Sequence, residues 1–122
     1  VLIAINPARQ FSQANNTKRG SDVNALLNAV QQYAADNRGA LPTGITTTAQ
    51  NISSTGANVC TTLVTRYLAA LPVDPSINNG AAVTDCIAAY DSGYTVVRSA
   101  TDNRITVAAP AAELQQVISV TR

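Results

Sequence analysis

The chain has 122 residues and a mass of 12.6 kDa, which suits one domain with a single core rather than two domains. Its net charge of +1 and charged fraction of 12% exclude the strong basic field with which proteins attract nucleic acid or anionic membranes. The chain has no histidine and only two cysteines, so it cannot build a Ser-His-Asp or Cys-His catalytic site. Neither paired carboxylates nor a Gly-rich phosphate loop stands out in the sequence. We therefore expect no enzyme and no cofactor.

The chain begins with a short apolar segment that ends at Asn6-Pro7. Val1, Leu2, Ile3 and Ile5 have no evident partner inside so small a domain, so we expect them, together with Pro7, to serve in assembly by packing against another molecule. Five apolar residues are too few to cross a bilayer, which takes about 20, so we expect them to be the end of a longer apolar helix. Pro7 lacks a backbone donor and is expected to weaken that helix locally. We expect residues 1–20 to be the exposed lower part of one long helix and residues 21–122 to be a globular domain.

A regular helical pattern follows in the next part of the chain. Apolar residues recur at the spacing of one helix face at Val23, Leu26, Leu27, Val30 and Tyr33. Gly20 predicts a soft point, where Ser21 could cap a new helical segment and Asp22 could lie near its positive end. Asn37 and Gly39 are typical stop signals. The apolar face of this helix requires a cover from elsewhere in the domain.

The middle of the chain contains more loop than regular structure. Residues 43–58 are rich in Thr, Ser, Gly and Asn without periodicity and predict an exposed loop. Helical spacing over residues 59–68 predicts a short second helix, which must stop before Leu71-Pro72-Val73-Asp74-Pro75 because two prolines forbid its continuation. Residues 76–89 are expected to form another loop.

Three strands are predicted in the last third of the chain, over residues 93–99, 104–109 and 116–121. Residues 101–103, Thr-Asp-Asn, supply turn chemistry between the first two and predict a hairpin. One face of such a sheet would cover the apolar helix face. The predicted fold is therefore α+β: a long N-terminal helix packed on a small antiparallel sheet of three to four strands, with a short second helix.

The two cysteines, Cys60 and Cys86, have no neighbouring Cys or His with which to form a redox pair or a zinc site. A disulfide between them is the leading prediction. Closing a loop of this length stabilises a small domain by about 3 to 4 kcal/mol in the loop-entropy model. The alternative is two unrelated buried thiols in a reducing compartment.

Two weaker patterns concern charged residues. Four aspartates in predicted loops could converge on calcium, although we favour turn-forming and capping roles, which explain the same placement: Asp74, Asp85, Asp91 and Asp102. Three basic residues could form a strip near the start of the helix: Arg9, Lys18 and Arg19. Such a strip could meet lipid head groups or DNA, but we favour a solvated helix face or charge pairing with a neighbouring subunit.

The order of these features resembles bacterial type IV pilins and the related major pseudopilins of type II secretion. The resemblance rests on the apolar start through Pro7, on the helix end Tyr33-Ala34-Ala35-Asp36-Asn37-Arg38-Gly39-Ala40-Leu41-Pro42, and more loosely on residues 71–75. Beyond these only the layout agrees, a helix followed by three or four antiparallel strands. The resemblance covers the first 42 residues best.

What the resemblance implies is a structural subunit. Members of this family are cut by a prepilin peptidase, carry a methylated N-terminus when mature, and are held in the inner membrane by an apolar half-helix. They then polymerise into a surface filament with those half-helices bundled in its core. The resemblance therefore implies that the partners of this chain are further copies of itself, the pilus assembly machinery and the inner membrane. It also implies a location at the cell surface.

Two classes of function stay open at this point. The first is a filament-forming subunit, whose filament could serve motility, adhesion, DNA uptake or secretion, because fold does not determine which. The second is a minor pilin or pseudopilin that acts as a binding module through its loops. A change of stability on addition of a ligand would favour the second class.

Overall fold

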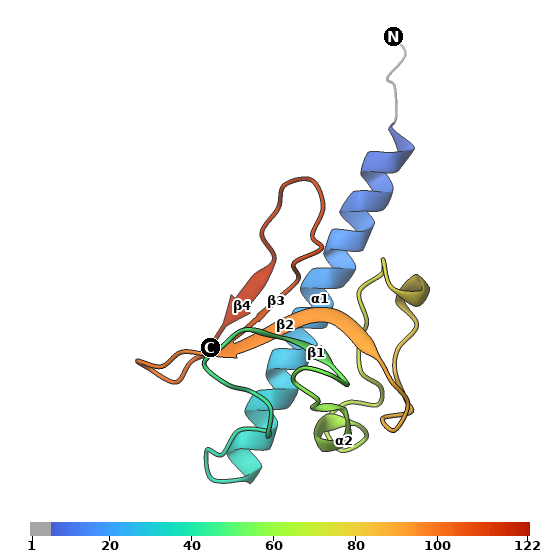
Figure 1. The fold of residues 1–122 in the computed structure, drawn as a ribbon. Coiled ribbons are helices and arrows are strands. Elements are labelled where there is room, and N and C mark those ends of the chain that lie inside the picture. The colour runs from blue at the N-terminus through green and yellow to red at the C-terminus, as the bar shows by residue number, and fades with distance from the viewer. Residues whose placement is uncertain (1–5) are drawn as a thin grey trace.

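The computed structural model describes residues 6–122. One long helix, α1 (Pro7–Asp36), packs across an antiparallel sheet and extends well beyond it at the amino end (Figure 1). The four expected assembly residues Val1, Leu2, Ile3 and Ile5 lie outside the described residues. The predicted α+β class is confirmed.

Helix α1 begins where Asn6 and Pro7 place it. The side chain of Asn6 accepts a hydrogen bond from the backbone N–H of Arg9 at 3.3 Å, which is the contact of an N-cap. Pro7 occupies the first helical position, where its missing N–H is not needed. Within the described residues Pro7 therefore starts the helix instead of weakening it from inside.

The predicted soft point at Gly20 was wrong, because α1 runs through it without interruption. A glycine costs a helix only about 1 kcal/mol relative to alanine, and burial of the apolar Val23 side chain one turn further on, worth about 1.5 to 3 kcal/mol, outweighs that cost. Ser21 is exposed within the helix and does not cap it. The helix ends as predicted, where the N–H groups of Asn37 and Gly39 bond to carbonyls of the last turn.

The sheet has four antiparallel strands in the order β1-β2-β3-β4. Their bounds are β1 Gln50–Ser53, β2 Asp91–Arg98, β3 Ile105–Ala108 and β4 Ser119–Thr121. The last three match the predicted strands, with boundaries that agree to within three residues. Strand β1 lies in the segment predicted as a loop, so that part of the prediction was wrong. Its register with β2 is irregular between Asn51 and Ser53, which removes the alternation that would have revealed a strand.

The second helix, α2 (Cys60–Leu63), is shorter than the predicted 59–68. It has no side-chain cap, and the β-branched residues Thr61, Thr62 and Val64 do little to extend it. The residues beyond it keep the predicted inward orientation without being helical, since Tyr67 and Leu68 pack against the core. One turn of 3₁₀ helix, η1 (Asn78–Gly80), interrupts the following loop.

The core lies between α1 and the sheet. Val23, Leu26, Leu27 and Val30 are at most 2% exposed, and Tyr33 is partly buried with its ring edge against Tyr67. Alternate residues of the strands meet them from the sheet: Ile52, Tyr94, Val96, Ile105 and Val107. The predicted helix face is thus covered by the sheet.

Candidate functional site

The amino end of α1 stands clear of the domain (Figure 1). Residues 7–11 are all exposed, and the first buried residue of the helix is Asn16. At 1.5 Å per residue, about 13 Å of helix precedes that point. Phe11 presents its ring to solvent at 71% exposure. The helix contacts the domain at earlier residues than the expected boundary after residue 20, because Asn16 and Arg19 are already buried against the domain.

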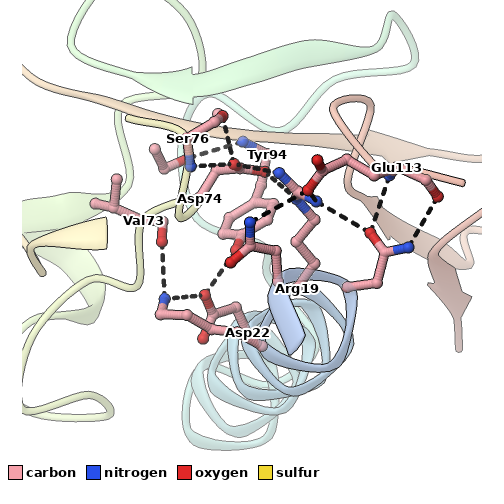
Figure 2. Close-up of polar contacts among 12 residues, drawn as sticks. Arg19, Asp22, Val73, Asp74, Ser76, Tyr94 and Glu113 are labelled. Carbon is pink, nitrogen blue, oxygen red and sulfur yellow. Dashed lines mark hydrogen bonds and ion pairs between the residues drawn. The ribbon is translucent and has the colours of Figure 1, made fainter. Parts of the chain in front are cut away.

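Arg19 is the centre of a buried polar cluster, shown in Figure 2. Its side chain is 1% exposed and donates two hydrogen bonds to the carboxylate of Asp74, from Nε at 2.8 Å and from NH2 at 3.1 Å. NH1 reaches Glu113 Oε2 at 2.7 Å and Asn16 Oδ1 at 3.0 Å. The expectation that Arg19 belongs to a solvated basic strip was therefore wrong.

The three charged groups of this cluster stabilise one another's ionised forms. The hydrogen bond to Asp74 raises the pKa of Arg19 above its ordinary value, although burial opposes this. Burial pushes the pKa of Asp74 upward, but the bonds from Arg19 and Ser76 outweigh it and the pKa is lowered. Hydrogen bonds from Arg19, then Asn15 and Ser12, lower the pKa of the Glu113 carboxyl. All three groups are therefore charged at neutral pH.

A second branch of the cluster surrounds Asp22. Its Oδ2 accepts from Lys18 Nζ at 2.6 Å and from the buried hydroxyl of Tyr94 at 2.6 Å. Lys18 Nζ also donates to the carbonyl of Val73 at 2.9 Å. Asp22 thus joins α1 to Tyr94 of β2 and, through Lys18, to the segment before Asp74. The prediction that Asp22 lies at the start of a helical segment was wrong, because it lies inside α1.

The backbone around Asp74 is held in place by β2. The N–H of Asp74 donates to the carbonyl of Ser92 at 2.7 Å, and Ser76 returns two hydrogen bonds to the Asp74 carboxylate. Gly93, at φ +78°, makes this approach possible: a Cβ there would lie 2.8 Å from the Cβ of Asp74 and 2.7 Å from Ile77 Cδ1. Glycine at this position lets the two segments touch.

On the other side of α1, residues 109–118 between β3 and β4 form a strap across the helix. Asn16 pairs with the backbone of Glu113, accepting from its N–H at 2.9 Å and donating to its carbonyl at 2.8 Å. The Glu113 carboxylate also accepts from Ser12 and Asn15. Within the described residues no buried side-chain polar atom lacks a hydrogen-bond partner. The strap is therefore attached by polar contacts that are fully paired.

The predicted disulfide between Cys60 and Cys86 is present, with 5.4 Å between the two Cα atoms. It joins α2 to Cys86, 26 residues further along the chain, and so closes a loop between the two cysteines. Asp74 lies inside that loop. The disulfide therefore limits the freedom of the segment that presents Asp74 to Arg19.

The four aspartates considered as calcium ligands do not come together. In residues 6–122 there is no group of three or more His, Cys, Asp or Glu side chains that could hold a metal ion. Asp74 binds Arg19, and the other three accept backbone N–H groups in their own turns: Asp85, Asp91 and Asp102. Their turn-forming role explains the placement that the sequence analysis noted.

Comparison of the chain with protein-family models, curated proteins and solved structures found no match. In the part of the chain that the structure describes, no helix has the length and apolar character needed to cross a bilayer.

Proposed function

We propose that this chain is the structural subunit of a type IV pilus or pilus-like surface filament, and that it polymerises through the amino end of α1. The observation that carries the proposal is the placement of that end. Residues 7–11 project from the domain with Phe11 exposed, and the sequence that leads into them is the apolar run Val1 to Ile5. An apolar segment joined to the projecting end of a helix gains free energy by being buried against another molecule.

The partner that this proposal requires is a further copy of the same chain. In the sequence of each copy, an apolar segment precedes α1 at one end, and the domain lies at the other. Such a subunit packs head to tail, and head-to-tail contacts that do not close into a ring give an open filament. The resemblance to pilins in the first 42 residues supports the same arrangement. On this proposal the subunit reaches the cell surface from an inner-membrane pool through its assembly machinery.

Charged substitutions at the helix start test the proposal in cells that express the chain from its own gene. Ile3→Asp and Phe11→Asp should abolish filaments seen by electron microscopy while the protein level and the disulfide stay normal. Ile87→Asp is the matched control, since Ile87 is 95% exposed beside Cys86, which the disulfide ties to α2. It should leave filaments intact. Unchanged filaments in both helix variants would refute assembly through α1.

The second candidate is a binding module, which two open hollows on the domain favour. One, of about 310 Å³, lies beside the loop that contains Asp85, and the other, of about 440 Å³, lies between the end of α1 and Arg98. A ligand held in either would raise the melting temperature of the isolated chain. Double-stranded DNA is a first probe for the second hollow only, where Arg98 supplies a positive charge, because Asp85 and Asp91 line the first. A concentration-dependent rise in Tm, together with the absence of this chain from filaments, would favour this candidate over the filament subunit.

A further inference from the structure

The contact between α1 and the rest of the domain changes character along the helix. From Val23 to Val30 it is apolar, whereas from Ser12 to Asp22 it consists of hydrogen bonds and ion pairs. Apolar side chains packed on a sheet tolerate small displacements, because dispersion contacts are not directional. Hydrogen bonds and ion pairs require a particular geometry. The polar part is therefore the part that determines how far along its axis the helix sits.

Arg19 holds two separate segments against the same turn of α1. Asp74, 55 residues away in sequence, approaches it from the disulfide loop, and Glu113, 94 residues away, approaches it from the strap. We call Arg19, Asp74, Glu113 and Asn16 the Arg19 clamp. In Figure 2, where α1 is seen nearly end-on, these contacts leave the helix sideways toward the surrounding loops. A force along the helix axis therefore loads them together in shear.

Sliding the helix by one turn would disrupt this arrangement in either direction. A turn is 3.6 residues, or about 5.4 Å. A slide one way brings Asn15 or Asn16 to Asp74 and leaves a buried carboxylate without its cation. A slide the other way brings Asp22 or Val23 toward Asp74, which places the buried carboxylate against a second carboxylate or an apolar side chain. Either state is strongly disfavoured in a buried site, so the helix has one allowed register.

We propose that the Arg19 clamp locks α1 in register against a pull along its axis, and so transmits tension from the helix start to the domain. In a filament held together by the amino ends of its helices, every pull on a domain passes through this contact. The existence of such tension in a filament depends on the proposed function. The resistance of the isolated chain to pulling along the helix axis does not. The disulfide contributes by limiting how far the segment around Asp74 can move when the helix is pulled.

Single-molecule force spectroscopy on the full chain tests the lock, with one handle at the amino end and the other at Arg122. Glu113→Gln removes the carboxylate charge and keeps the shape of a half-exposed side chain, so the variant should still fold. Arg19→Met removes the centre of the clamp. The control is Ile105→Val, which trims the core at a residue that is 1% exposed and whose backbone pairs with Arg122 rather than with a clamp residue. We expect both clamp variants to unfold at least several-fold faster than wild type at constant force. The control is compared with Glu113→Gln, which should unfold faster under load than Ile105→Val even where the two variants lose the same equilibrium stability.

Pulling in a second direction separates a lock from general stabilisation. Handles at Thr48 and Thr101 load β1 and β2 without pulling on α1. In that geometry Glu113→Gln should unfold at nearly the wild-type rate. Unfolding rates that follow equilibrium stability alone, in both directions and for all variants, would overturn the lock. This result is independent of whether filaments form, so failure of the lock and failure of the proposed function can be told apart.

Discussion

Arg19 and Asp74, 55 residues apart in sequence, form a two-bond ion pair inside the domain, at 2.8 Å and 3.1 Å, with side chains that are 1% and 0% exposed. The pair joins the middle of α1 to the loop that the disulfide closes. Two-bond arginine–carboxylate pairs are directional, so this contact orients the loop as well as attaching it. Together with the bond from Lys18 to the Val73 carbonyl, this pair positions the long helix relative to the disulfide loop.

Removing the arginine should destabilise the domain strongly. Arg19→Met leaves the buried Asp74 carboxylate without a cation, which typically costs about 3 to 5 kcal/mol. Replacing both partners, as Arg19→Met with Asp74→Leu, should recover part of that loss, because the buried charge is removed as well. Urea denaturation measures both free energies of unfolding. A loss below about 1 kcal/mol in the single variant would show that the pair contributes little to stability.

Acid should weaken the domain through Asp74 and Glu113. Both carboxyl groups have a pKa below the ordinary value when folded, so folding favours their ionised forms. Their contribution is fully present above the ordinary values of about 4 and is lost as pH falls through the lowered folded values. Glu113→Gln should therefore flatten the dependence of the melting temperature on pH below about 4. The same acid slope in wild type and variant would contradict this assignment.

The apolar face of α1 should carry much of the core energy. Leu27 is fully buried, so Leu27→Ala should reduce the free energy of unfolding by about 2 to 5 kcal/mol. Val117→Ala is the control, because Val117 is 90% exposed and should change stability by less than about 0.5 kcal/mol. Equal effects of the two substitutions on the free energy of unfolding would show that packing of this helix face contributes little to stability.

Reduction of the Cys60–Cys86 disulfide should lower the free energy of unfolding, because the unfolded chain gains conformational entropy when the bond no longer closes the loop. For a loop of this size the entropy model gives about 3.5 kcal/mol, or a fall in Tm of roughly 10 to 20 °C. Intact mass without reductant should show the loss of two protons. Two free thiols in protein from an oxidising compartment, or an unchanged Tm after reduction, would contradict the assignment.

Periodicity was enough to predict the parts of the fold that repeat a pattern. The spacing of Val23, Leu26, Leu27 and Val30 revealed the buried helix face, and alternation revealed the strands that became β2 and β3. Strand β1 could not be predicted this way, since its pairing with β2 shifts register within four residues. It is held by its neighbour and by burial of Ile52, neither of which is visible in its own sequence.

The polar cluster is not apparent from its residues taken one at a time. In the sequence, Arg19 resembles the basic residues near it, and Asp74 resembles the other loop aspartates. One signal was available: Asn16 and Arg19 continue the i, i+3, i+4 spacing of the apolar face toward the amino end. Polar residues on a buried helix face need buried partners, so the sequence pointed to some partner. It could not identify Asp74 and Glu113, because the tertiary fold alone brings them to α1.

The central claim is that the chain forms filaments through the amino end of α1, and a helical reconstruction by electron cryomicroscopy tests it most directly. Filaments would be sheared from cells that express the chain, identified by mass spectrometry and imaged without stain. The account predicts that this chain is the repeating subunit, with α1 oriented so that Phe11 and the residues before it face the filament axis and contact neighbouring copies. Filaments built from other proteins, or a subunit packing whose contacts leave Phe11 and the start of α1 in solvent, would contradict it.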